Sequence, residues 1–153
     1  MITLRDAIEI KASPEQIIDF FLNFKENFYI WHPDHVECRY LTLGPLKENS
    51  VIYFEEYLHG KLHKLKLRIT LIKPNSRIEY KSFMGTKGVL LMDPRSTMTL
   101  FTAEMHMGSN MPVLGKIMDI IILKFLSRQL KGIRQHMVEE GQNLKKILEQ
   151  SIS

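Results

Sequence analysis

The sequence predicts an α+β protein in which one curved antiparallel sheet of about six to seven strands wraps around a long C-terminal helix. Three observations predict this class: a strand pattern followed by two short helices, a run of about six strand patterns, and a helical pattern over about residues 112–149. This order buries the apolar faces of the sheet and the helix against each other. With 153 residues, the chain is expected to form one domain over 1–153.

The first elements follow from alternation and capping. Residues 3–12, "TLRDAIEIKA", alternate between apolar and polar side chains as a half-buried strand does. Ser13 then suits a helix N-cap, Pro14 the first helical position, and Gln16 the closing residue of a capping box, so a short helix is expected over 14–24. A second short helix or turn is expected over 25–30, before "WHPDH".

Six further strand patterns come next, and glycine or proline stands near most of their boundaries. They are "VECRYLTL" (36–43), "SVIYFEEYL" (50–58), "KLHKLKLRITLI" (61–72), "RIEYKSFM" (77–84), "GVLLM" (88–92) and "STMTLFTAEMHM" (96–107).

The composition excludes several classes of protein. The net charge of +4 is mild and no run of five or six cations occurs, so nucleic-acid binding is not expected. Cys38 is the only cysteine, so no intrachain disulfide can form, which fits a reducing compartment. The N-terminus has no signal-peptide pattern, and no uncharged run reaches about 18 residues, the length that spans a membrane. We therefore expect a cytoplasmic protein without a transmembrane segment.

The hairpin around His59-Gly60 fixes a register. If these two residues form the loop, Glu56 faces His63 on the apolar, inward side of the sheet, and Glu55 faces Lys64 on the polar side. Glu56 and His63 are then polar groups on a buried face. They either bond each other at the open end of the sheet or belong to a site, and a slip of one residue would turn Glu55 inward instead.

The last helix carries a second polar pair. Its apolar stripe contains Glu140, while His136 lies on the same flank and Glu139 points away. The stripe consists of Leu126, Leu130, Ile133, Met137, Leu144 and Leu148. A His–Glu pair four residues apart is common on helix surfaces, but it can also chelate one ion. The carboxylate in a core stripe favours the ion, because a buried charge requires a compensating cation or hydrogen bonds.

The segment "WHPDH" supplies the third part of a predicted metal site. Folding the chain about position 46 brings residues 35–37 beside 55–57, so His35 lies near Glu56, and His32 is one turn earlier. Together with His136 and Glu140, two imidazoles and two carboxylates suit zinc, or less specifically manganese or iron. Whether His32 or His35 is the first ligand stays open, and we favour His35.

The order of elements resembles the helix-grip fold of the START and Bet v 1 (SRPBCC) superfamily, which includes polyketide cyclases and lipid carriers. A histidine near "WHP", a glutamate on the following strands and H-x-x-x-E on the final helix also resemble the 2,4-diacetylphloroglucinol hydrolase family. This resemblance implies zinc in an internal cavity and cleavage of a carbon–carbon bond beside an aromatic ketone. It implies His136, Glu140, Glu56 and His35 or His32 as ligands.

Two histidines are candidates for moving a proton, because imidazole titrates near neutrality. His63 faces Glu56 across the hairpin, and His106 shares one face of the last strand with Glu104, directed either to a cavity or to solvent. The many methionines suit an adaptable cavity or plain core. Residues 111–126, "MPVLGKIMDIIILKFL", are apolar almost all round, which indicates a lid, a homodimer contact, a membrane-surface dock or a cavity wall.

The resemblance therefore implies a metal-dependent hydrolase that acts on carbon–carbon bonds in ketonic substances and binds a small hydrophobic ligand. The alternatives are a carrier or sensor of a lipid, polyketide or isoprenoid, and a metal-stabilised domain that acts through partners.

Overall fold

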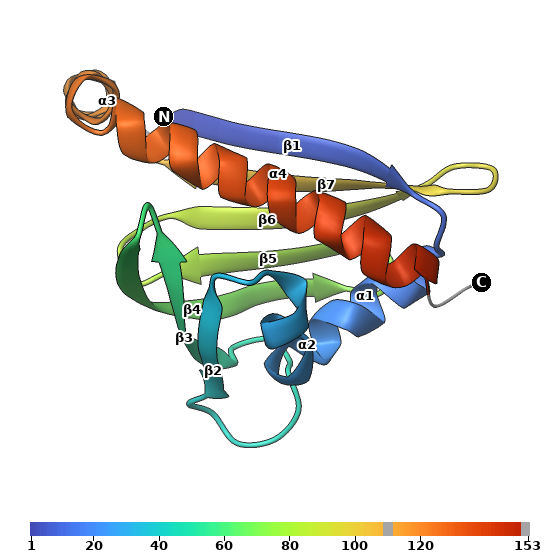
Figure 1. Cartoon of the computed structure of the whole chain (residues 1–153). Coiled ribbons are helices and arrows are strands. Elements are labelled where there is room, and N and C mark those ends of the chain that lie inside the picture. Colours follow the sequence, from blue (N-terminus) through green and yellow to red (C-terminus); the bar gives the residue numbers. More distant parts are fainter. Residues whose placement is uncertain (109–111, 151–153) are drawn as a thin grey trace.

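A computed structural model describes residues 1–108 and 112–150 and has the predicted architecture (Figure 1). Strand β1 is followed by two short helices, six more strands and two C-terminal helices. The elements are β1 (Ile2–Ile10), α1 (Pro14–Leu22), α2 (Phe24–Trp31), β2 (His35–Tyr40), β3 (Val51–Leu58), β4 (Lys61–Lys73), β5 (Arg77–Ser82), β6 (Lys87–Pro94), β7 (Thr99–Met107), α3 (Leu114–Phe125) and α4 (Ser127–Gln150).

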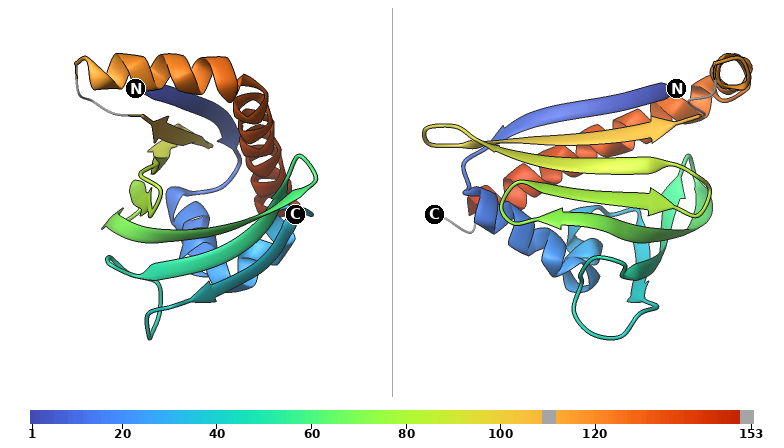
Figure 2. Two further views of the ribbon diagram at one scale, coloured as in Figure 1. Left: turned by 90° about the vertical axis from the view of Figure 1, so that its left-hand side faces the viewer. Right: turned by 180° about the vertical axis from the view of Figure 1, so that it is seen from behind.

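The seven strands form one antiparallel sheet in the order β1-β7-β6-β5-β4-β3-β2. The sheet curves strongly, and α4 lies across its concave face (Figures 1 and 2). Helices α1 and α2 cover the lower part of the same face, between the sheet and the C-terminal end of α4. No described helix is long and apolar enough to cross a membrane.

Local sequence explains the first helix. The Ser13 hydroxyl accepts a hydrogen bond from the Gln16 amide at 3.2 Å, and the Gln16 side chain accepts one from the Ser13 amide at 2.8 Å. Pro14 occupies the first turn, where its missing N–H has no cost. The predicted capping box is confirmed. It aims four apolar residues of α1 into the core, namely Ile17, Ile18, Phe20 and Phe21.

The predicted hairpin register is also confirmed. Glu56 pairs with His63 and Glu55 with Lys64, and the loop residue His59 has a positive φ of 52°. The tip of this hairpin packs on α4, where a Cβ at Gly132 would lie 1.6 Å from Nε2 of His59. Glycine at position 132 therefore permits the hairpin to close against the helix.

The single long helix expected over 112–149 is wrong in one respect. The chain breaks at Leu126, which has non-helical torsions, and α3 and α4 run in different directions (Figure 2). Ser127 begins α4, a position that suits serine because its hydroxyl competes for backbone hydrogen bonds inside a helix. As a result α4 crosses the sheet, whereas α3 extends over one end of the molecule.

Candidate metal centre

Two imidazoles and two carboxylates from three distant segments meet between the sheet and α4. Nε2 of His35, at the start of β2, lies 3.0 Å from Oε1 of Glu140 and 3.3 Å from Nε2 of His136. Oε2 of Glu56, on β3, lies 3.6 Å from Nε2 of His35 and 3.4 Å from Nε2 of His136. One ligand atom from each residue lies within 4.8 Å of all the others. We refer to His35, Glu56, His136 and Glu140 as the His–Glu cluster.

A β-bulge in β2 brings His35 into this cluster. Glu37 pairs with Glu55, so an uninterrupted ladder would set Val36 opposite Glu56. The register shifts between His35 and Glu37, and His35 pairs with Glu56 instead. Bulges commonly re-aim a side chain next to a functional site. Without this one, an apolar side chain would stand where the first imidazole lies.

The orientation of His35 is fixed from behind. Its Nδ1 donates a hydrogen bond to the backbone carbonyl of Phe28 at 2.8 Å, and its ring stacks on the Phe28 ring with centroids 4.0 Å apart. In a neutral His35 the single N–H would be the one at Nδ1, so Nε2 would be free to bind a metal ion at the cluster. Metal-binding histidines are typically held by this kind of outer hydrogen bond.

The His–Glu cluster brings imidazoles and carboxylates together in a largely buried site. Burial would lower the pKa of His136, but hydrogen bonds to Glu140 and Glu56 outweigh it and raise that pKa to about 10. Burial would raise the pKa of Glu140, but hydrogen bonds to His136 and His35 lower it. Without a metal, the carboxylates are therefore balanced by an imidazolium. A divalent cation would serve the same electrostatic purpose.

His32 occupies a different place. Its Nδ1 accepts a hydrogen bond from the Asp34 amide at 3.0 Å, and its Nε2 donates to Oε2 of Glu139 at 2.8 Å. Its ring lies against the ring of His136, with centroids 4.0 Å apart. His32 also forms a second candidate donor group with His35 and His136. The group that contains both carboxylates includes His35 and not His32, so His35 stays the favoured first ligand. Glu139, which was expected to point away from the apolar stripe of the helix, accepts the hydrogen bond from His32.

The N-terminal helices anchor α4 at the cluster. Nε1 of Trp31 donates to the backbone carbonyl of Glu140 at 3.0 Å, and Nδ2 of Asn143 donates to the carbonyl of Trp31 at 3.0 Å. These bonds fix the rotation of α4 about its axis and its position along that axis, and α4 carries His136 and Glu140. The tryptophan of "WHPDH" therefore positions the site although it offers no ligand atom.

The cluster borders a cavity of about 570 Å³ between the sheet and α4, and Glu56, His136 and Glu140 are part of its wall. Most of the remaining wall is apolar and includes Phe21, Phe54, Leu90, Phe101, Met105 and Ile133. A cavity of this size and composition fits a small, mostly hydrophobic molecule.

Tyr80 is a further polar group of the cavity wall, which sequence reasoning missed. It pairs with Gly88 across β5 and β6, and a Cβ at Gly88 would lie 1.9 Å from Cζ of Tyr80. The ring thus rests on the bare backbone of glycine. Burial raises the pKa of Tyr80, and the charges of Glu140 and Glu56 add to this, so its hydroxyl stays a donor. The alternation of β5 could have indicated that Tyr80 points inward. Its pairing with Gly88 depends on the register between β5 and β6, which the sequence pattern does not give.

The two other candidate histidines lie apart from the cluster. His63 lines the cavity, but it is exposed. Glu56, which pairs with it across the hairpin, contacts His35 and His136. For His106, the sequence left both a cavity-facing and a solvent-facing direction open. Its Nδ1 lies 3.0 Å from the Thr3 hydroxyl, and its neighbours Met105 and Met107 line the cavity. Because side chains alternate along a strand, His106 is on the outer face.

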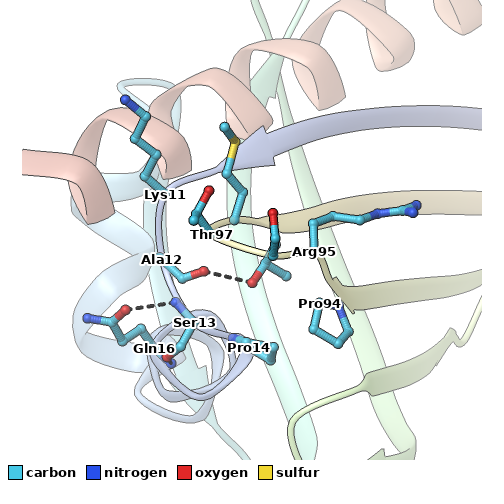
Figure 3. A pocket seen from close by; sticks show the side chains of 11 residues that line it. Lys11, Ala12, Ser13, Pro14, Gln16, Pro94, Arg95 and Thr97 are labelled. Carbon is cyan, nitrogen blue, oxygen red and sulfur yellow. Dashed lines mark hydrogen bonds between the residues drawn. The ribbon is translucent and has the colours of Figure 1, made fainter.

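A second, smaller pocket of about 390 Å³ lies where the chain leaves β1, beside the turn between β6 and β7 (Figure 3). The Thr99 hydroxyl donates to the Ala12 carbonyl at 2.7 Å and closes its base. Lys11 and Arg95 at its rim are exposed. The hydrogen bonds drawn in Figure 3 join Thr99 to the Ala12 carbonyl and Gln16 to the Ser13 amide. We therefore assign this pocket a structural role.

No protein-family model and no curated protein matches the chain. Solved structures do match its fold. A START superfamily protein from Mycobacterium smegmatis aligns with a TM-score of 0.72 and 15% identity over 97% of both chains. A protein from Thermus thermophilus aligns with a TM-score of 0.74 and 12% identity over 99% of this chain and 100% of that chain.

The di-domain ARO/CYC protein StfQ from the steffimycin biosynthetic pathway aligns with a TM-score of 0.73 and 14% identity, over 99% of this chain and 51% of that chain. These similarities show the fold alone. The chain therefore has the helix-grip fold of START, Bet v 1-like and ARO/CYC proteins, as the sequence predicted.

Proposed function

We propose that this protein is a divalent-metal hydrolase that acts on a carbon–carbon bond of a small hydrophobic or aromatic ketone. One observation carries the proposal: the imidazoles of His35 and His136 and the carboxylates of Glu56 and Glu140 converge between the sheet and α4, with one ligand atom of each within 4.8 Å of all the others. Buried carboxylates need a compensating cation or hydrogen bonds, and a divalent metal ion would supply the cation. Two histidines and two carboxylates form a donor set that zinc accepts, and manganese or iron would also fit.

The cluster residues would hold the ion through Nε2 of His35, Nε2 of His136 and one oxygen each of Glu56 and Glu140. A bound divalent ion would polarise a ketone oxygen and lower the pKa of water. The two carboxylates would neutralise its charge, which makes a semi-buried site tolerable. The Phe28 carbonyl, through Nδ1 of His35, would keep that ligand in its metal-binding tautomer.

The cavity indicates the substrate class. Its walls are mostly apolar, and its polar groups gather at the cluster and at Tyr80. A ketone with an apolar or aromatic body would bury that body in the cavity and direct its oxygen to the polar end. Tyr80, which stays protonated, would donate a hydrogen bond to a substrate oxygen. His63, at an exposed part of the same cavity, is the proposed group for exchanging a proton with solvent.

The resemblance to 2,4-diacetylphloroglucinol hydrolase supports the reaction type, because the chain has the same residue types at His136, Glu140 and Glu56. We take His35 as the first histidine of the pattern, because its Nε2 lies 3.0 Å from Oε1 of Glu140. An acylated phenol is accordingly the first substrate to test.

The second candidate is a carrier or sensor that binds a lipid, polyketide or isoprenoid without chemistry. The mostly apolar wall of the 570 Å³ cavity supports it. So does the fold shared with a START superfamily protein and an ARO/CYC protein of steffimycin biosynthesis. Under this function, His136 would balance Glu56 and Glu140 as an imidazolium, and no metal would be needed.

A metal analysis separates the two candidates. Protein purified without an affinity tag should contain one equivalent of zinc, manganese or iron, and His136→Ala should lose it. Turnover of acylated phenols should depend on that metal, cease with a chelator and return when the metal is restored. Stoichiometric metal without turnover would leave a metal-stabilised binding protein, and protein that binds no metal would leave the carrier.

A further inference from the structure

Helix α3 exposes an apolar surface that nothing in the described part of the chain covers. Ile120 is 62% exposed, Leu123 54% and Phe125 70%. Other exposed apolar residues of this segment are Val113, Leu114, Ile117, Met118, Ile121 and Leu126. A contiguous apolar surface of this kind marks an interaction site. Residue 111, the first of the segment singled out in the sequence, lies outside the described residues.

Cationic side chains lie on α3 and on the first part of α4. Residues 112–135 carry five cationic side chains, all exposed, against one acidic side chain, Asp119, which is bound by the Met1 ammonium. The cations are Lys116, Lys124, Arg128, Lys131 and Arg134. The chain as a whole has a net charge of +4, so the remaining residues balance to zero. Two of these cations, Lys116 and Lys124, lie on the apolar helix itself, and the other three lie on α4, which begins directly after it.

This surface surrounds one end of the cavity. Met118 and Ile122 of α3 and Met84 of the β5–β6 turn line the cavity. Phe83 and Met84 in that turn are 62% and 85% exposed. Figures 1 and 2 show α3, the β3–β4 hairpin and the β5–β6 turn at the same end of the molecule. A single flat partner could cover α3 and the turn together.

We propose that α3, together with Phe83 and Met84, docks onto the surface of a bilayer that contains anionic lipids. An apolar helix flanked by lysine and arginine lies in the plane of such an interface, with its apolar side chains among the acyl chains. Lysine stems bury their methylene groups while the ammonium reaches the headgroups. At 12 residues, α3 is too short to span the bilayer.

Charge decides between a bilayer and a second copy of the chain. Two copies joined through α3 would bring the cations of both copies together, whereas anionic headgroups neutralise them. A docked protein would also turn this end of its cavity toward the lipid, so that an apolar ligand could pass between them without crossing water. The docking depends on α3 and not on the His–Glu cluster, and it stands or falls separately from metal binding.

The test is sedimentation of the full chain with two kinds of vesicle, one of phosphatidylcholine and one of equal parts phosphatidylcholine and phosphatidylglycerol. The protein should bind the anionic vesicles, more weakly as salt is raised, and bind phosphatidylcholine poorly. Ile117→Gln with Ile120→Gln should weaken binding by more than about tenfold, because buried apolar area is lost. Lys116→Gln with Lys124→Gln should weaken it about fivefold per lysine.

Matched controls are available in exposed positions elsewhere. Leu41→Gln with Leu43→Gln, in the loop after β2, removes apolar side chains that are 48% and 96% exposed and should leave binding unchanged. Lys47→Gln with Lys73→Gln removes two exposed charges and should also have little effect. Thermal unfolding of each variant checks that it is folded.

A second measurement does not depend on loss of function. Cys38 is buried, so a cysteine placed by Ile120→Cys can be labelled selectively with an environment-sensitive dye. Anionic vesicles should shift its emission to the blue, and the same dye on Leu43→Cys should not respond. Absence of vesicle binding, or equal losses in the control variants, would overturn the proposal. So would a dimer that Ile117→Gln with Ile120→Gln dissociates while vesicles have no effect, because α3 would then join two copies.

Discussion

Nε2 of His35 lies 3.0 Å from Oε1 of Glu140, a residue 105 positions further along the chain. The contact joins the start of β2 to the middle of α4. The other nitrogen of His35 already donates to the Phe28 carbonyl. The close approach of this nitrogen and this oxygen is favourable only when a proton or a metal ion lies between them.

Glu140→Gln should weaken zinc binding by more than about tenfold, since even groups that only support metal ligands contribute factors of about 10–100. The amide keeps the shape of the side chain but loses its charge. Competition with a chelating dye measures the affinity. Glu139→Gln is the matched control, because Glu139 is the adjacent carboxylate and contacts His32 instead. Equal losses in both variants would contradict the assignment of the ligands.

The apparent zinc affinity should rise with pH. His136 must lose its proton to bind a metal, and hydrogen bonds to Glu140 and Glu56 overcome the effect of burial and raise its pKa to about 10. Displacing one proton changes the apparent affinity about tenfold per pH unit below that value, so titrations between about pH 6 and pH 8 should differ about a hundredfold. A pH-independent affinity would mean that His136 is not displaced.

The metal-free fold should show the opposite trend. The pKa of His136 is raised from 6.5 to about 10 on folding, so its contribution to stability is complete below about pH 6.5. That contribution is lost as the pH rises toward 10. Urea unfolding of chelator-treated protein across this range measures the loss. His136→Gln, which cannot titrate, should flatten the profile.

The sequence predicted those parts of the molecule that depend on local pattern. The capping box at Ser13 and the hairpin register at Glu56 and His63 each depend on residues close in sequence, and both are confirmed. Local pattern alone does not predict the pairing of His35 with Glu56, because a simple fold-back about position 46 places Val36 opposite Glu56. A β-bulge shifts the register by one residue, and no short-range sequence pattern predicts this bulge.

Other features depend on tertiary packing. The helical pattern continues through Leu126, so the break that separates α3 from α4 is not visible in the periodicity. The orientation of His106 was open because both faces of β7 carry large side chains, and only the curvature of the sheet decides which face lies inside. Sequence could therefore identify the His–Glu cluster but not the direction of every neighbouring group.

The choice between the first two histidines can be tested directly. His35→Asn should abolish high-affinity zinc binding, because Nε2 of His35 is the nitrogen that faces Glu140 and Glu56. His32→Asn should reduce the affinity by a smaller factor, on the order of tenfold, since His32 only packs on His136 and bonds Glu139. Isothermal titration of both variants provides the comparison. The reverse order would assign the metal to His32, His35 and His136.

Gly88→Ala should destabilise the protein and distort the polar end of the cavity. The new Cβ would lie 1.9 Å from Cζ of Tyr80, so the ring must leave its place on the glycine backbone. Overpacking of this kind costs about 1–3 kcal/mol, which lowers the melting temperature by several degrees in a domain of this size. Thermal unfolding measures the change.

Two further variants test the cause of that loss. Gly141→Ala is the control, because its Cβ would meet Oδ2 of Asp6 at 3.3 Å, a contact a carboxylate can relieve, and alanine favours a helix. Tyr80→Ala combined with Gly88→Ala removes the clash, so the two changes should cost less together than the sum of each alone. Additive losses would show that the ring and the glycine do not depend on each other. In that case the close packing of Tyr80 on Gly88 would not be what sets the position of its hydroxyl in the cavity.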